Sequence, residues 1–107
     1  MKYKVILLPE AKADIFDIYL YVAQNDLLSR AEKLLSNLEK RCEALNHSPQ
    51  RGHLVPELQR IHIKVFREIH FEPYRIIYQI VEPEVYIHAV LDGRRDLQEL
   101  LELRLLR

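Results

Sequence analysis

The sequence predicts an α+β domain of two layers, in which an N-terminal strand and a helical hairpin pack on an antiparallel sheet and a short helix follows (β-α-α-β-β-β-α). Changes in the spacing of apolar residues along the chain predict this fold class. Apolar residues recur at helical spacing from residue 10 to about residue 47, at every second position from 64 to 91, and at helical spacing again after 94. The 107 residues, 49% apolar and 30% charged, suit one compact core and exclude a mainly disordered chain. We therefore expect residues 1–107 to form a single domain.

The first half of the chain predicts one strand and two helices. Residues 3–8 are rich in β-formers and end at Pro9, which suits the first turn of a helix. Residues 10–24 carry apolar side chains on one helical face, and residues 29–47 carry a leucine stripe. The segment 48–60 has no stable period and is expected to be a loop.

The second half predicts a three-stranded meander over residues 64–71, 74–81 and 85–91. If Glu82 pairs with Val85, one face faces the helices and holds Ile76, Tyr78, Ile80, Val85, Ile87, Ala89 and Leu91. The same register places on the opposite, more exposed face Arg75, Ile77, Gln79, His88, Val90 and Asp92. A short amphipathic helix is expected from Arg94 onward, after a turn at Asp92 and Gly93.

Composition narrows the classes of function. Sixteen Lys and Arg residues balance sixteen Asp and Glu residues, so no basic field steers the protein onto nucleic acid. The single cysteine, Cys42, cannot form an internal disulfide, and neither a signal-peptide pattern nor a run of about 20 apolar residues is present. The five histidines match no zinc motif, and the two glycines form no phosphate-binding loop. We expect a cytoplasmic protein with no metal, no cofactor and no membrane partner.

Polar residues on the exposed sheet face form the candidate site: Arg67, Arg75, Gln79, His88, Asp92, Arg94 and Arg95. Arginines can hold a phosphodiester and offset charge on phosphorus, and His88 could protonate a leaving oxygen, which would be metal-free RNA cleavage. The alternative is that three of the arginines form surface ion pairs, each worth about 0–1 kcal/mol. Those pairs would join Arg67, Arg75 and Arg95 to Glu68, Asp92 and Asp96.

Five segments resemble the RelE/ParE superfamily of type II toxin–antitoxin toxins: Leu8–Ile15, Asp17–Tyr21, Ser48–Gly52, the Tyr-Arg-Ile-Ile-Tyr run of 74–78, and the Gly-Arg-Arg-Asp-Leu run of 93–97. The resemblance covers nearly the whole chain. It implies a sheet packed by an N-terminal helical hairpin, in agreement with the periods. It also implies a cognate antitoxin and therefore a hetero-oligomer.

Two activities divide the superfamily, and the resemblance bears on both. RelE-like toxins cut mRNA on the ribosome without metal, and the arginines important there correspond to Arg75 and Arg95. The lysine pair that RelE-like toxins carry on the preceding strand is not reproduced, because this region has only Lys64 and Arg67. The position of the C-terminal tyrosine in their active site falls near Leu101. ParE-like toxins inhibit DNA gyrase and lack the nuclease residues.

These departures, together with zero net charge, favour a ParE-like gyrase inhibitor. The alternative is a RelE-like, ribosome-dependent endoribonuclease with Arg75, Arg95, Arg67 and His88 as catalytic residues. A third reading is an inactive family member that only binds a partner. The resemblance implies an acidic antitoxin whose disordered segment folds along an apolar groove between hairpin and sheet, rimmed by arginines. The residues expected to contact antitoxin or target are Arg67, Arg75, Arg94 and Arg95.

Overall fold

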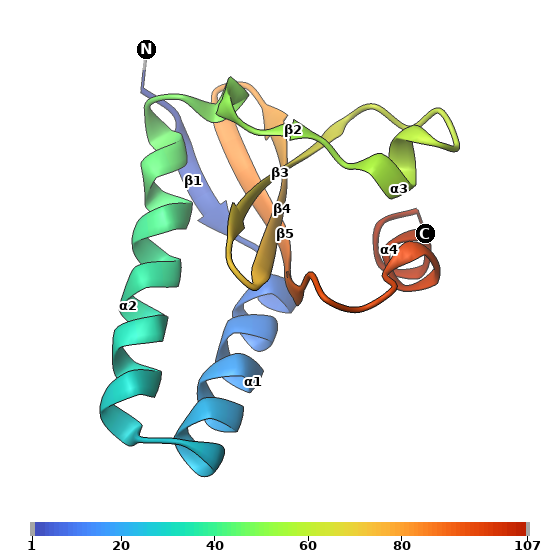
Figure 1. The fold of residues 1–107 in the computed structure, drawn as a ribbon. Helices are drawn as coiled ribbons and strands as arrows, with labels where there is room; N and C mark the ends of the chain where they lie inside the picture. Colours follow the sequence, from blue (N-terminus) through green and yellow to red (C-terminus); the bar gives the residue numbers. More distant parts are fainter. Residues whose placement is uncertain (1, 107) are drawn as a thin grey trace.

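The computed structural model describes residues 2–106 and confirms the α+β class and the predicted order of the main elements. The elements are β1 (Lys4–Leu7), α1 (Pro9–Asn25), α2 (Leu28–Glu43), the 3-10 turns η1 (Ala44–Asn46) and η2 (Pro49–Arg51), β2 (His53–Leu54), α3 (Pro56–Gln59), β3 (Phe66–Phe71), β4 (Tyr74–Val81), β5 (Glu84–Asp92) and α4 (Gln98–Leu105). The segment 48–60, expected to be a loop, therefore contains the 3-10 turn η2, the short strand β2 and the helical turn α3. Figure 1 shows the long α1–α2 hairpin on one side of the strands and α4 on the other.

The five strands form one sheet in the order β1-β5-β4-β3-β2. Strand β1 pairs in parallel with β5, and the other neighbours are antiparallel. The N-terminal strand thus finds its partner 80 positions along the chain, with Lys4 opposite Glu84. No helix within residues 2–106 has the length and apolar character needed to cross a membrane.

The predicted register of the last hairpin is wrong by one position on each strand. Val81, and not Glu82, begins the pairing, and it lies opposite Glu84 because Glu82 and Pro83 are the two turn residues. Each residue of β4 next to the turn therefore lies opposite a residue two positions earlier on β5 than predicted. Because side chains alternate with a period of two, this shift leaves them on the predicted faces of the sheet. The residues of this stretch that were predicted to face the helices do so.

A β-bulge at His88 changes the faces further along β5. Tyr78 lies opposite Ile87, but Ile77 lies opposite Ala89, so His88 is the extra residue. Beyond it the alternation is reversed, and Val90 joins the core under the hairpin. The predictions that Ala89 and Leu91 face the hairpin and that Val90 is exposed are therefore wrong.

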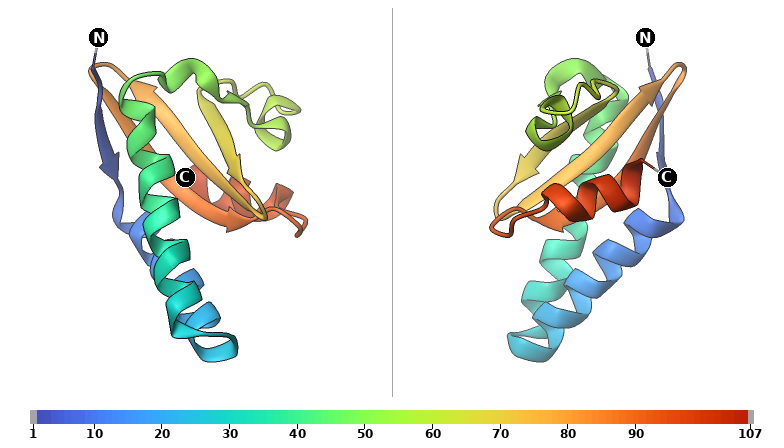
Figure 2. Two further views of the ribbon diagram at one scale, coloured as in Figure 1. Left: turned by 60° about the vertical axis from the view of Figure 1, so that its left-hand side comes forward. Right: turned by 90° about the vertical axis from the view of Figure 1, so that its right-hand side faces the viewer.

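Both faces of the sheet are covered. The cluster under the hairpin is made by Tyr3, Ala11, Ile15, Leu38, Cys42, Leu45, Ile76, Tyr78, Val85, Ile87 and Val90. A second cluster lies under α3 and α4 and is made by Val55, Leu58, Phe66, Ile77, Ala89, Leu91, Leu97 and Leu101. In Figure 2, α2 lies in front of the strands in the left view, whereas α4 lies in front of them in the right view. The face expected to be exposed is thus largely closed, and Ile77 is fully buried.

Candidate functional site

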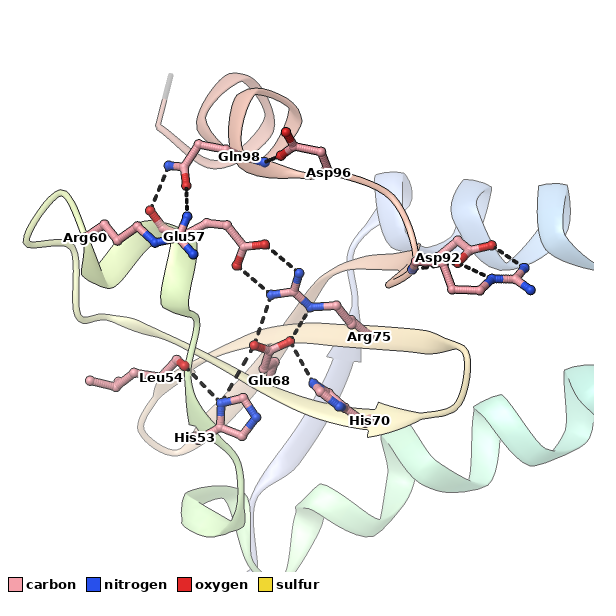
Figure 3. A network of polar contacts seen from close by, with 11 residues as sticks. His53, Leu54, Glu57, Arg60, Glu68, His70, Arg75, Asp92, Asp96 and Gln98 are labelled. Atoms are coloured by element: carbon pink, nitrogen blue, oxygen red, sulfur yellow. Dashed lines mark hydrogen bonds and ion pairs between the residues drawn. The ribbon is translucent and has the colours of Figure 1, made fainter.

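A polar network lies beside the second cluster, with Arg75 of β4 at its centre (Figure 3). Arg75 donates two hydrogen bonds to Glu57 of α3, from Nη1 to Oε2 at 2.6 Å and from Nη2 to Oε1 at 2.7 Å. It donates two more to Glu68 of β3, from Nε to Oε1 at 2.5 Å and from Nη2 to Oε2 at 3.0 Å. We call these three residues, with His53 and His70, the Arg75 network.

Local structure explains why these side chains meet. Alternation along β3 points Glu68 and His70 to the same face, and His70 lies opposite Arg75 in the β3–β4 ladder. Glu57 stands in the first turn of α3, which begins at Pro56. At the exit of β5, a Cβ on Gly93 would lie only 2.9 Å from Arg75 Cγ, so this glycine lets the chain pass over the arginine stem.

The three charged residues at the centre of the Arg75 network are nearly closed to water. The exposed fractions of the side chains are 11% for Arg75, 13% for Glu57 and 1% for Glu68. Hydrogen bonds from Arg75 hold the pKa of Glu57 below its ordinary value, and the bonds to Glu57 raise the pKa of Arg75. The guanidinium is therefore committed to two carboxylates, and the three groups together carry one surplus negative charge.

A cavity of about 360 Å³ opens beside Glu68. It is lined by Arg41, Arg51, Gly52, His53, Glu68, Ile69 and His70. His70 Nε2 lies 3.2 Å from Glu68 Oε1, and His53 Nδ1 lies 3.7 Å from Glu68 Oε2. Two imidazoles and one buried carboxylate thus converge at the mouth of this cavity.

Arg67 does not join this network. It alternates with Glu68 on β3, so its side chain points to the hairpin face, where Nη1 donates to the carbonyl of Gly52 at 2.8 Å. The expectation that Arg67 and Arg75 share one surface is corrected by this alternation.

His88 also lies apart from Arg75 within the described chain. Its Nε2 lies 3.1 Å from Oε1 of Gln79, which was predicted to share this face of the sheet. Its ring lies edge to face against Phe66, with the ring centroids 5.2 Å apart. Gln79 is four residues beyond Arg75 on β4, which is about 13 Å along a strand. Burial lowers the pKa of His88, so the neutral imidazole is favoured.

The arginines after β5 form an exposed turn. Arg94 binds Asp92 twice, from Nε to Oδ1 at 3.0 Å and from Nη2 to Oδ2 at 2.7 Å. These bonds lower the pKa of Asp92 to about 2. Arg95 is exposed beside them. Arginines of the candidate site therefore do form ion pairs, but the partners differ from those expected. Arg94 pairs with Asp92, and Arg75 pairs with Glu57 and Glu68.

An apolar groove of about 330 Å³ runs along the hairpin at the end of β1. It is lined by Leu7, Lys12, Ile15, Phe16, Tyr19, Leu35 and Glu39. The resemblance implies a groove between the hairpin and the sheet, rimmed by arginines. This groove lies mainly between α1 and α2, with only Leu7 from the sheet, and the charged residues in its lining are Lys12 and Glu39. Phe16 is 57% exposed, which is unusual for an aromatic side chain that has apolar neighbours.

Comparisons with known proteins show the family through a family model and the fold through similar solved structures. The family model described as the ParE toxin of the type II toxin–antitoxin system parDE matches residues 5–97. The chain is similar to a solved structure of the chromosomal ParDE system from P. aeruginosa, with 16% identity, a TM-score of 0.72, and coverage of 85% of this chain and 96% of that one.

A second similar structure is the toxin–antitoxin complex RelBE2 from Mycobacterium tuberculosis, with 18% identity, a TM-score of 0.65, and coverage of 86% of this chain and 99% of that one. No protein of curated function matches the sequence. The family match extends from β1 to the residue before α4, so the chain belongs to the ParE toxin family of type II toxin–antitoxin systems.

Proposed function

We propose that this toxin inhibits DNA gyrase and does not cut mRNA. The observation that carries the proposal is the commitment of Arg75, the arginine that a RelE-like nuclease would need, to Glu57 and Glu68. A guanidinium that holds a phosphodiester must present its donors to the ligand. Here four of its hydrogen bonds go to carboxylates of the same chain.

Freeing Arg75 for RNA would be costly. Glu68 is 1% exposed, and a buried carboxylate that loses its partner destabilises a protein by about 3–5 kcal/mol. The other residues of the nuclease reading do not converge on Arg75 either, because Arg67 points to the opposite face and His88 lies further along the sheet. Leu101, near the position of the nuclease tyrosine, is fully buried on the inner face of α4, in the second cluster. These placements support a target other than RNA.

A cognate antitoxin completes the proposal. The apolar groove along the hairpin suits one face of an amphipathic segment, and exposed Arg94 and Arg95 suit acidic side chains of the same partner. The RelBE2 structure is itself a toxin–antitoxin complex, which supports a hetero-oligomer of this kind. In this arrangement the antitoxin covers Phe16.

The target is tested by inducible expression without antitoxin. If the toxin inhibits gyrase, its expression is expected to activate a DNA-damage reporter and to leave the 5′ ends of translated transcripts unchanged. The purified toxin is expected to block supercoiling by purified gyrase. New codon-phased ends without the reporter would reject the proposal in favour of a ribosome-dependent endoribonuclease. Growth unaffected by the expressed, folded chain would mean a protein that only binds a partner.

The double variant Arg75→Leu/Glu68→Leu sharpens this test. It removes Arg75 together with Glu68, the more deeply buried of its two partners, and leaves only Glu57, which is 13% exposed, without the guanidinium, so the fold is expected to persist. The gyrase proposal requires this variant to remain toxic, whereas a nuclease that works through Arg75 would lose its activity.

The antitoxin surface is tested by Phe16→Asp. Because Phe16 is 57% exposed, the change should leave the melting temperature nearly unchanged while abolishing co-purification with co-expressed antitoxin. Tyr21→Asp is the matched control, since Tyr21 lies on the same helix, is 68% exposed and is outside the groove lining. Equal loss of binding in both variants would place the antitoxin elsewhere on α1.

A further inference from the structure

We propose that His53, Glu68 and His70 form a binding site for one zinc ion that ties β2 to β3. The three side chains each offer one ligand atom, and these atoms all lie within 4.8 Å of one another (Figure 3). Two come from neighbouring positions on one face of β3, and the third comes from the facing strand β2. The inference is independent of the gyrase proposal, because it concerns the chain without target or antitoxin.

The separations suit four-coordinate zinc. Bonds of about 2.0–2.1 Å in a tetrahedral site place neighbouring ligand atoms about 3.3 Å apart. His70 Nε2 and Glu68 Oε1 are 3.2 Å apart, and His53 Nδ1 and Glu68 Oε2 are 3.7 Å apart. The His53 and His70 rings meet nearly at right angles, with centroids 5.3 Å apart, so their edges can point to one ion. Only small side-chain rotations separate this arrangement from a bound geometry.

Groups behind two of the three ligands lie where they can orient them. The other ring nitrogen of His70, Nδ1, lies 3.6 Å from Glu72 Oε1, which is longer than a hydrogen bond, and a small rotation of the exposed Glu72 side chain would form the contact by which a carboxylate orients a zinc-bound histidine. Arg75 holds both oxygens of Glu68. His53 Nδ1 lies 3.0 Å from the carbonyl of Leu54, a contact that this nitrogen must leave in order to bind an ion. Since the His53 side chain is 59% exposed, its ring can turn to offer either nitrogen.

Charge and donor type favour zinc over the hard cations. Glu57 and Glu68 exceed the charge of Arg75 by one negative unit, which attracts a cation, whereas Arg41 and Arg51 in the cavity lining oppose one. Arg41 donates to the carbonyl of His70 and lies over the Phe71 ring. Two imidazole nitrogens and one carboxylate oxygen suit Zn²⁺, while Mg²⁺ and Ca²⁺ require several oxygen ligands. The cavity leaves room for a water as fourth ligand.

A bound ion would stabilise a weakly held segment. Strand β2 has only two residues, and its ladder with β3 joins His53 to Glu68 and Leu54 to Arg67. A ligand that binds only the folded chain stabilises it by mass action. Zinc should therefore raise the melting temperature and protect the 48–54 segment from proteolysis.

The test uses the untagged full chain, stripped of metal with a chelator and dialysed against zinc chloride. One zinc ion per chain is expected, with a rise in melting temperature, and excess Mg²⁺ should not displace it. His53→Asn and His70→Asn should each abolish binding, and Glu72→Gln should weaken it by about tenfold. His47→Asn is the control, because His47 is exposed and lies outside the cluster.

Two results would overturn the site: no zinc retained by the wild-type chain, or equal retention by His53→Asn and the wild type. Circular dichroism establishes that each variant is folded before its metal content is measured. If His70→Asn does not fold, His53→Asn carries the test alone, since the exposed His53 ring contributes little to packing.

Discussion

The two faces of the sheet hold their titratable groups in opposite ways. Under the hairpin the environment is apolar, and burial raises the pKa of the Cys42 thiol to about 12, so the group stays neutral. Beside α3, Arg75, Glu57 and Glu68 stay charged because they pair with one another. Burial favours the neutral form of a group unless a partner stabilises the charge. One sheet thus carries an apolar core on one face and a charged network on the other.

The difference predicts different sensitivities. Apolar packing resists changes of salt and pH, whereas an ion pair depends on the protonation of its members. Breaking a buried pair costs more than the pair contributes, because the remaining charge stays buried. Substitutions on adjacent residues of β4, whose side chains point to opposite faces, can therefore separate the two kinds of stabilisation.

Arg75→Ala should have the largest effect, a loss of about 3–5 kcal/mol in the free energy of unfolding, because Glu68 is left buried without its partner. Urea unfolding of wild type and variant measures it. The folded-state pKa of Glu57 lies below its ordinary value of 4.5, so the contribution of the pair is present above that pH and is lost as the pH falls through the lower folded-state value. The difference in the free energy of unfolding between wild type and variant should therefore decrease as the pH falls through this range.

The double variant Arg75→Leu/Glu68→Leu serves as the control for this effect. It should be more stable than Arg75→Ala, because Glu68, the more deeply buried of the two carboxylates, is no longer left as a buried charge without its partner. A single variant as stable as the double one would show that Glu68 reaches water once Arg75 is gone.

Ile76→Ala should cost about 2–5 kcal/mol, because Ile76 is fully buried under the hairpin and its removal leaves a cavity. The loss should be the same at neutral pH and below 4.5, the ordinary pKa of Glu57, since the cluster of described buried residues that contains Ile76 includes no carboxyl group and no histidine. Unfolding curves at both pH values provide the measurement. A loss that shrinks in acid, as expected for Arg75→Ala, would mean that the two faces are energetically coupled.

Tyr78→Phe should cost about 1–3 kcal/mol, because the tyrosine hydroxyl satisfies two buried backbone groups. It donates to the carbonyl of Pro49 at 2.5 Å and accepts from the Gly52 amide at 3.0 Å. The effect should be local, with faster hydrogen exchange at Gly52 and unchanged exchange in α2. Uniformly faster exchange would instead indicate that Tyr78 acts mainly through core packing.

The period of two in the sequence predicted the faces of the sheet correctly up to the bulge at His88. The residues assigned to the hairpin face next to the last turn are correct, because a period of two is a property of any regular strand. The bulge at His88 adds a residue without a mark in composition, so the faces of Ala89, Val90 and Leu91 could not be predicted. The helical turn α3 has four residues, too few to show a period. The cover on the second face was missed for this reason.

The candidate site was predicted in part. Arg75 was selected, and Glu68 and His70 could have been added, since they alternate on β3 and His70 lies opposite Arg75 across a short turn. Glu57 and His53 come from the segment without periodicity, whose path is fixed by tertiary contacts such as the Tyr78 hydroxyl. Sequence spacing likewise gave no sign of the His53, Glu68 and His70 cluster, because His53 lies fifteen positions before Glu68, the first residue of the other pair.

Arg94→Ala should have the smallest effect on stability, with no measurable change in melting temperature, because the Arg94–Asp92 pair is at the surface. Its effect should appear in titration instead. Arg94 lowers the pKa of Asp92 from 3.8 to about 2 through hydrogen bonds, so the variant should return this pKa towards 3.8. Carboxyl carbon shifts followed by NMR against pH measure it directly.

The same variant separates function from stability at the exit of β5. If Arg94 contacts acidic side chains of an antitoxin, Arg94→Ala should weaken that complex, and the loss should diminish as salt concentration rises. Lys33→Ala is a matched control for the loss of one positive charge, because Lys33 is exposed and lies outside the lining of the apolar groove. Identical salt dependence in the two variants would mean that the antitoxin senses overall charge and not the arginine turn, whereas a loss confined to Arg94→Ala would assign that turn to the partner.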